Sequence, residues 1–154
     1  MLQPLLEKHP GLHGTVFDLP GVIAGAKRPS RPPDICCRMD FVAGDFFSSV
    51  PAGDLYLLKH VLHDWGDDEF LEILRNCRAA MRGGGRIAII ELVLGEIGEP
   101  GPTPLMDMNM LVMASGRERS FTEYAHLLGK ARFGEVRITT IHSPWAIIEA
   151  SCEV

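Results

Sequence analysis

The stretch that decides the fold lies between residues 54 and 93, and it reads DLYLL (54–58), KHVLHDWG (59–66), DDEFLEILRNCRAAM (67–81) and RIAIIELV (86–93). The first and last of these runs are short and almost continuously apolar, which is typical of strands buried on both faces. The run between them has a helical apolar stripe, and acidic residues fill its first turn, where the helix dipole favours them. The stripe consists of Phe70, Leu74, Cys77 and Met81.

Gly83–Gly85 separates this helix from the next strand. A phosphate-binding glycine loop follows a strand and opens a helix, which is the opposite order. We therefore interpret the three glycines as a turn that ends the helix. The order of strand, helix and strand predicts a layered α/β sheet.

The rest of the chain continues the alternation. We expect helices at 2–9, 105–113 and 122–132, a helical turn at 22–27, a proline-rich loop at 28–34, and strands at 14–19, 39–43, 135–141 and 145–150. Ser120 or Thr122 is a suitable cap for the last helix. The last two strands are too close for a helical crossover, so they should be antiparallel to each other. The fold class is therefore α/β, with a mostly parallel sheet that ends in an antiparallel hairpin.

Composition excludes several functions. A chain of 154 residues, 46% hydrophobic and 23% charged, is typical of one globular domain. A formal charge of −5 argues against a nucleic-acid partner. Neither a membrane-spanning run nor a signal peptide is evident. The four cysteines form no C-x-x-C pair, so we expect reduced thiols in a cytoplasmic protein, with Cys77 and Cys152 packed in the interior.

Acidic and aromatic residues follow the first two strands. Asp18 stands at the carboxyl end of one strand, where doubly wound sheets place an acidic residue that binds a ribose. Gly44-Asp45-Phe46-Phe47 follows the next strand and offers a carboxylate and an aromatic ring that together suit an adenine. Both stretches are also typical of ordinary turns. The residues alone favour the turn at Asp18 and leave the two interpretations open at Gly44–Phe47.

A cation, two histidines, a carboxylate and a tryptophan follow the strand at 54–58, where open α/β sheets bind ligands. His60 and His63 have H-x-x-H spacing, but no familiar third ligand accompanies them, so we predict no metal site. His63 alone is also compatible with a satisfied polar residue. Glu91 ends an apolar strand and should face a polar cavity, whereas Glu118 is compatible with a solvated charge between two arginines.

Five segments, in this order, resemble one family. They are Phe17-Asp18-Leu19-Pro20, Gly44-Asp45-Phe46-Phe47, Leu62-His63-Asp64-Trp65, Ile73-Leu74-Arg75-Asn76-Cys77 and Gly116-Arg117-Glu118-Arg119. The chain is similar to the S-adenosylmethionine-dependent small-molecule O-methyltransferases of the plant caffeate and isoflavone type, to which acetylserotonin O-methyltransferase belongs. The resemblance implies a Rossmann-like class I methyltransferase domain over residues 1–154. It also implies methyl transfer from S-adenosylmethionine to a hydroxyl group of a small, aromatic acceptor.

The resemblance assigns roles to individual positions. His63 matches the catalytic base, and Glu91 and Glu118 match the two acidic residues that hold it. The positions that match cofactor-binding residues are Asp18, Leu19, Asp45, Phe46, Lys59, Asp64 and Trp65. Those in the helix that lines the acceptor pocket are Met106, Asn109, Met110 and Met113. Without the resemblance, the methionines of this helix are typical core residues.

The family also has features that this chain lacks. Its glycine-rich D-x-G-x-G-x-G strand, which receives the methionine part of the cofactor, and its helical dimerisation domain are not in the sequence. The resemblance therefore implies an N-terminally truncated methyltransferase whose homodimer contacts are missing, and we expect the isolated chain to bind the cofactor weakly and turn over little. A non-catalytic remnant that binds a partner is the alternative. A Rossmann-type oxidoreductase is less favoured, because no G-x-G-x-x-G follows any expected strand.

Overall fold

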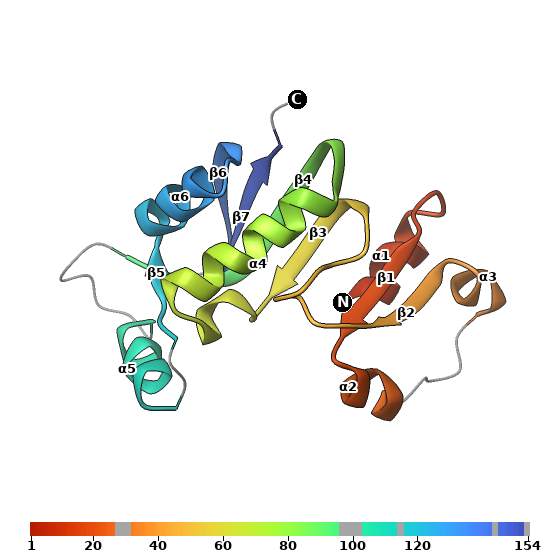
Figure 1. Ribbon diagram of the computed structural model, residues 1–154, viewed down its shortest axis with the longest axis horizontal. Coiled ribbons are helices and arrows are strands. Elements are labelled where there is room, and N and C mark those ends of the chain that lie inside the picture. Colours follow the sequence, from red (N-terminus) through yellow and green to blue (C-terminus); the bar gives the residue numbers. More distant parts are fainter. Residues whose placement is uncertain (27–31, 96–102, 114–115, 143–144, 153–154) are drawn as a thin grey trace. The chain divides into compact units, whose positions relative to one another are not determined.

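The computed structural model describes residues 1–26, 32–95, 103–113, 116–142 and 145–152, with the backbone alone described at Leu111, Met113 and His142. The chain forms two compact units, Met1–Pro51 and Ala52–Val154 (Figure 1). Among the described helices, none combines the length and the apolar character that a bilayer crossing requires. The expectation that residues 1–154 form a single domain stays a prediction.

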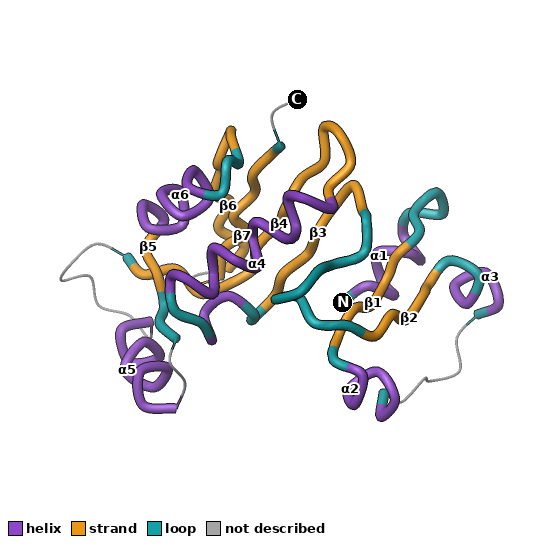
Figure 2. The backbone as a smooth tube through the Cα atoms, in the orientation of Figure 1, coloured by secondary structure: helices purple, strands orange, loops and turns teal. Residues whose placement is uncertain are grey.

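The first unit is a two-stranded parallel sheet with three short helices (Figure 2). Its elements are α1 (Leu2–Lys8), β1 (Gly14–Asp18), α2 (Pro20–Gly25), α3 (Pro33–Cys36) and β2 (Met39–Ala43). Asp18 pairs with Ala43 at the end of the ladder, so the segments that follow the two strands leave the sheet at the same edge. The Arg38 guanidinium donates to the carbonyl oxygens of Leu6 and Leu12 at 3.0 Å and thereby ties α1 to the start of β2.

The second unit contains a five-stranded mixed sheet. Its strands are β3 (Gly53–Lys59), β4 (Met81–Leu94), β5 (Arg119–Ser120), β6 (Gly134–His142) and β7 (Trp145–Ser151). The main path runs β3-β4-β7-β6, and β5 pairs with the end of β4. The β3–β4 and β4–β5 ladders are parallel, whereas β7 is antiparallel to both β4 and β6. The expected parallel sheet with an antiparallel carboxyl-terminal hairpin is confirmed.

Two amphipathic helices, α4 (Asp67–Ala80) and α6 (Phe121–Lys130), lie side by side over one face of this sheet (Figure 1). The expected stripe on α4 is buried at Phe70, Leu74 and Cys77, together with Leu71 and Ile73. Met81, the fourth expected member, is instead the first residue of β4 and is half-buried. Of the two candidate caps for α6, Ser120 is the one used, and it forms a capping box with Glu123. The third helix of the unit, α5 (Thr103–Met113), contacts β4.

Several expectations about local structure are wrong. The glycines at 83–85 do not form a separate turn after the helix but lie within β4, where the register against β3 shifts and Gly84 takes a φ of +75°. The expected loop at 28–34 contains the start of α3, and its residues 28–31 lie outside the described part of the chain. β3 is not buried on both faces: each of its residues is half-buried or exposed, and Leu55 is 52% exposed.

Side-chain burial also differs from expectation at three positions. Met106 and Met108 are 38% and 67% exposed, so they are not core residues. Cys77 is buried as expected, but Cys152 is only half-buried. The cysteines at all four positions are free thiols.

Candidate active site

The candidate site is centred on a single 3-10 turn, η1 (Leu62–Asp64), which follows β3 and precedes α4. His60 has a φ of 51°, so the chain turns sharply at the end of β3 and carries the next residues across the end of the sheet. His63, at the centre of η1, is 8% exposed. A polar ring this well buried requires hydrogen-bonding partners, and these come from residues distant in the sequence.

Two buried carboxylates face one nitrogen of the His63 ring. Glu118 Oε1 lies 3.0 Å from Nδ1, which is hydrogen-bonding distance, and Glu91 Oε2 lies 3.9 Å from the same atom. Because a carboxylate only accepts, Nδ1 carries a proton and donates it to Glu118. In the neutral ring Nε2 is then the acceptor, and the nearest charged group to it is Asp64 Oδ1 at 3.6 Å.

This arrangement changes the acidity of the groups. The hydrogen bond to Glu118 raises the pKa of His63, and the charge of Glu91 adds to that effect, while burial opposes both. Burial raises the pKa of Glu91, although His63 and two backbone amides act in the other direction. The imidazolium form of His63 is therefore favoured relative to a free histidine.

Glu91 holds the turn as well as facing the ring. Its Oε1 accepts hydrogen bonds from the backbone N–H groups of Val61 and Leu62, at 3.2 and 2.8 Å. Its Oε2 accepts from the Tyr124 hydroxyl at 3.3 Å, and the Glu91 side chain is fully buried. The surroundings of Glu91 are polar, as expected, because donors from η1 and α6 enclose its carboxylate. A cavity at this position stays a prediction.

Glu118 is 1% exposed, so the alternative interpretation of this residue as a solvated charge is also wrong. Asp107 of α5 accepts a hydrogen bond from the Glu118 backbone N–H at 2.8 Å. Just before it, Gly116 packs directly against the backbone of η1, and a Cβ there would lie 2.7 Å from Cα of Asp64. Only glycine permits this close approach without a shift of the turn.

The other candidates near η1 occupy different environments. Lys59 and Asp64 are exposed and Trp65 is half-buried. The His60 ring makes edge contacts with His63 and Trp145, at centroid distances of 5.2 and 4.5 Å. The absence of a metal site stays a prediction, since His63, Glu91 and Glu118 offer ligand-type atoms within 4.8 Å of one another.

The candidate cofactor residues of the first unit lie together at one edge of its sheet. Asp18 Oδ1 accepts from the Leu19 N–H at 2.8 Å, Asp45 Oδ1 accepts from the Phe47 N–H at 2.9 Å, and both aspartates are exposed. The backbone N–H of Gly44 donates to the Asp18 carbonyl oxygen at 2.9 Å, which links the two segments. Leu19 is exposed and Phe46 half-buried. Two exposed carboxylates beside an aromatic ring fit the hydroxyl groups and base of a nucleoside.

The candidate acceptor-binding residues lie on α5. Met106 and Asn109 are exposed, Met110 is half-buried, and the Met113 side chain lies outside the described residues. Sequence reasoning missed three residues that build the site: Tyr124, Asp107 and Arg119. Only Arg119 carries a local signal, because it follows Glu118 directly in the sequence. Tyr124 binds Glu91 and Asp107 binds the Glu118 backbone, and both partners are distant along the chain.

Each unit is of the α/β class: the first has exposed carboxylates at one edge of its sheet, and the second has a buried histidine that contacts two buried carboxylates. Comparison with known proteins is more specific. A family profile described as an O-methyltransferase domain matches residues 1–134. The chain belongs to this O-methyltransferase family.

Individual relatives agree with this assignment. Flavonoid 4'-O-methyltransferase 5 of Ocimum basilicum is 40% identical over 152 residues, which are 95% of this chain and 43% of that protein. Acetylserotonin O-methyltransferase of Mus musculus is 40% identical over 150 residues, or 93% and 38% of the two chains. The crystal structure of human N-acetylserotonin methyltransferase in complex with SAM superposes with a TM-score of 0.90 at 34% identity, over 99% of this chain and 44% of that one. The chain thus spans less than half the length of these relatives.

Proposed function

We propose that the chain carries the proton-accepting part of an S-adenosylmethionine-dependent O-methyltransferase, with His63 as the general base. The observation that supports this most is the hydrogen bond of 3.0 Å between His63 Nδ1 and the buried Glu118 carboxylate. It fixes the tautomer in which Nε2 is free to accept a proton. An acidic partner on the far nitrogen also stabilises the imidazolium that forms, which is the orienting role of the carboxylate in other histidine-based sites.

This chemistry suits methylation of a hydroxyl group. A phenol has a pKa of about 10, as tyrosine does, so at neutral pH it must lose a proton as its oxygen bonds to the methyl carbon. A positioned base contributes roughly 10²–10⁴-fold to such a step. S-adenosylmethionine, when bound, supplies an electrophilic methyl group, and alignment of oxygen, carbon and sulfur contributes up to about 7–11 kcal/mol.

The other candidate residues are proposed to bind either the methyl donor, S-adenosylmethionine, or the methyl acceptor. Asp18, Leu19, Asp45 and Phe46 suit the nucleoside of S-adenosylmethionine, because they combine exposed carboxylates with an aromatic ring. In the second unit, Lys59, Asp64 and Trp65 are also proposed as cofactor-binding residues. The residues proposed to bind the acceptor are Met106, Asn109, Met110 and Met113. We propose a small hydroxylated aromatic acceptor, as the names of the relatives suggest. A homodimer and a cytoplasmic location stay predictions.

The test is replacement of the proposed base. His63→Gln and a matched control, His126→Gln on the exposed face of α6, are compared with the unaltered chain. Transfer of a labelled methyl group from excess S-adenosylmethionine to a panel of hydroxylated flavonoids, phenazines and N-acetylserotonin is measured over long incubations, since we expect slow turnover. His63→Gln should lose about 10²–10⁴-fold in rate and His126→Gln nothing. Equal rates for all three proteins would contradict the proposal.

The second candidate is a remnant that no longer catalyses. It predicts that no acceptor is methylated and that His63→Gln changes nothing measurable. Calorimetric titration with S-adenosylmethionine separates the cases further. Our expectation is weak binding by this chain, and micromolar affinity would overturn that expectation.

A further inference from the structure

Arg119 is a fully buried arginine next in sequence to Glu118, and the proposed chemistry does not use it. It lies on the two-residue strand β5, where it pairs with Val93 of β4. Its guanidinium lies 4.7 Å from the centre of the Phe70 ring. A buried guanidinium is costly unless its donors are satisfied, so the identity of its acceptors indicates what it does.

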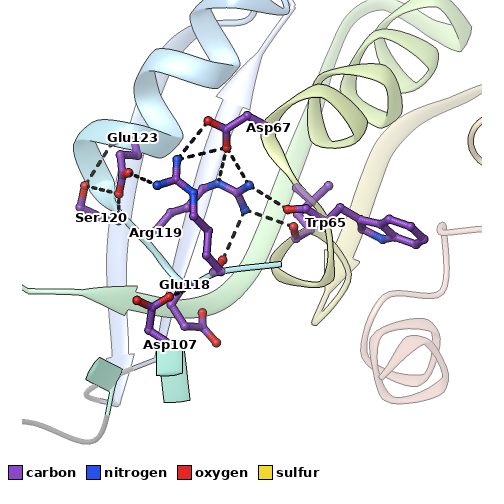
Figure 3. A network of polar contacts seen from close by, with 9 residues as sticks. Trp65, Asp67, Asp107, Glu118, Arg119, Ser120 and Glu123 are labelled. Carbon is purple, nitrogen blue, oxygen red and sulfur yellow. Dashed lines mark hydrogen bonds and ion pairs between the residues drawn. The ribbon is translucent and has the colours of Figure 1, made fainter. Parts of the chain in front are cut away.

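Two of these acceptors belong to the turn that carries His63. Arg119 Nη1 donates to the Leu62 carbonyl oxygen at 3.2 Å and Nη2 donates to the Trp65 carbonyl oxygen at 2.8 Å. These carbonyls flank His63 and Asp64, one on each side. Figure 3 shows the guanidinium between the backbone at Trp65 and the carboxylate of Asp67. Asp67 Oδ1 accepts from Nη2 at 2.8 Å and from Nε at 3.1 Å.

The turn has little internal support. Its own backbone hydrogen bonds, from Asp64 to Val61 and from Trp65 to Leu62, are 3.4 and 3.3 Å long. A 3-10 turn with such long bonds depends on external partners. The Glu91 carboxylate accepts hydrogen bonds from the N–H groups of the turn, and the Arg119 guanidinium donates to its carbonyl oxygens. The negative group thus lies at the positive end of the backbone dipole and the positive group at its negative end.

We propose that Arg119 is a positioning residue for His63. Its guanidinium donates hydrogen bonds to the backbone carbonyl groups on both sides of the turn, and Asp67 holds the guanidinium in place. Glu118 binds the imidazole and Arg119 binds the backbone that carries it, so two adjacent residues set where the ring lies. Burial raises the pKa of Asp67, but hydrogen bonds from Arg119 and Arg117 outweigh it and lower the pKa overall, so Asp67 remains an anion at neutral pH. The catalytic consequence rests on the proposed function of His63.

The chain offers a matched control. Arg117 also pairs with Asp67, at 3.0 Å, but its side chain binds Glu123 and makes no hydrogen bond to η1 among the described contacts. Arg119→Lys keeps the charge and loses the planar fork that reaches both carbonyls and Asp67. Arg117→Lys changes an arginine on the same carboxylate without touching the turn.

The experiment measures the titration of the His63 ring by NMR in the full chain, beside methyl transfer. The charged or titratable groups that face this ring are Glu118, Glu91, Asp64 and His60. In Arg119→Lys the ring should move away from Glu118, so the pKa of His63 falls and kcat drops about 10²-fold. KM for S-adenosylmethionine should rise as well, because the proposed cofactor residues Asp64 and Trp65 move with the same turn. Arg117→Lys should change none of these quantities.

The outcomes are separable. If Arg119→Lys lowers only the melting temperature, while the titration of His63 and kcat stay as in the unaltered chain, Arg119 is a structural residue and the proposal is overturned. If Arg119→Lys does not fold, Asp67→Asn takes its place and should shift the pKa of His63 in the same direction by less; no shift there overturns the proposal. If the titration shifts but His63→Gln retains full activity, the positioning role stands and the proposed function of His63 fails.

Discussion

The substitution Gly116→Ala tests how closely the site is packed. A Cβ at position 116 would clash most closely with the His63 carbonyl oxygen, and it would also lie 2.5 Å from the carbonyl carbon of Asp64 and 2.7 Å from its Cα. Carbon atoms in ordinary contact are about 3.5–4.0 Å apart. These neighbours are backbone atoms, which have no rotamer to change, so η1 has to move by at least about 1 Å to accommodate the methyl group.

A displacement of this size has two measurable consequences. Overpacking costs about 1–3 kcal/mol, and in a chain of this length each kcal/mol lowers the melting temperature by roughly 2–4 °C. The contact of 3.0 Å between His63 and Glu118 would lengthen beyond hydrogen-bonding distance, and a misplaced base costs about 10²-fold in rate. Fluorescence follows the unfolding, because Trp65 and Trp145 both lie in the second unit.

A second glycine provides the control. Gly129 lies in α6, and a Cβ there meets no atom within 4 Å. Gly129→Ala should therefore stabilise the chain by up to about 1 kcal/mol, through helix propensity alone. The close approach of Gly116 to η1 is refuted if Gly116→Ala melts at or above the temperature of the unaltered chain and its His63 ring signals do not move.

Two further perturbations address the charges. Glu118→Gln should lower the pKa of His63 and shift the acid limb of the pH–rate profile to lower pH with a reduced plateau, because the hydrogen bond to Glu118 is the main cause of the raised pKa. The raised pKa of His63 also stabilises the fold. This contribution is complete below about pH 6.5 and disappears as the pH rises through the pKa of folded His63. In urea, the loss of unfolding free energy caused by Glu118→Gln should therefore be larger at about pH 6 than at pH 8. Asp18→Asn should weaken S-adenosylmethionine binding about 10- to 100-fold by ligand-observed NMR, which also detects weak complexes, whereas Asp40→Asn on exposed β2 should not. An unshifted profile, or equal binding by both aspartate variants, would contradict the respective role.

Local patterns in the sequence were sufficient for most of the helices and strands. The stripe of α4 and the close spacing of β6 and β7 are properties of neighbouring residues, and both were predicted correctly. The burial of β3 was predicted wrongly, because an apolar run does not reveal whether other elements cover both faces of the strand. The three glycines suggested a turn, whereas pairing with β3 draws them into β4 as an irregular part of the ladder.

Some residues of the candidate site could likewise be predicted from the sequence, whereas others depend on contacts that form only in the folded chain. The resemblance carried by residues 62–65 pointed to His63, and the structure shows this side chain buried and hydrogen-bonded to Glu118. Residue type alone left Glu118 open to interpretation as a solvated charge between two arginines, since local sequence does not specify burial. Tyr124 and Asp107 were missed because the contacts that matter, to Glu91 and to the Glu118 backbone, exist only once α5 and α6 are packed.

The geometry around His63 depends on the register of a very short ladder. β5 pairs with β4 through Val93–Arg119 and Leu94–Ser120 only. Glu91 lies two residues before this ladder on one strand, and Glu118 lies one residue before it on the other. A slip by one residue would reverse the faces of the side chains, so the two carboxylates would no longer meet at the same ring nitrogen. Both residues of β5 are held by hydrogen bonds outside the ladder: Ser120 forms the capping box of α6, and the Arg119 guanidinium binds the backbone next to η1. These bonds therefore stabilise the register on which the proposed proton transfer depends.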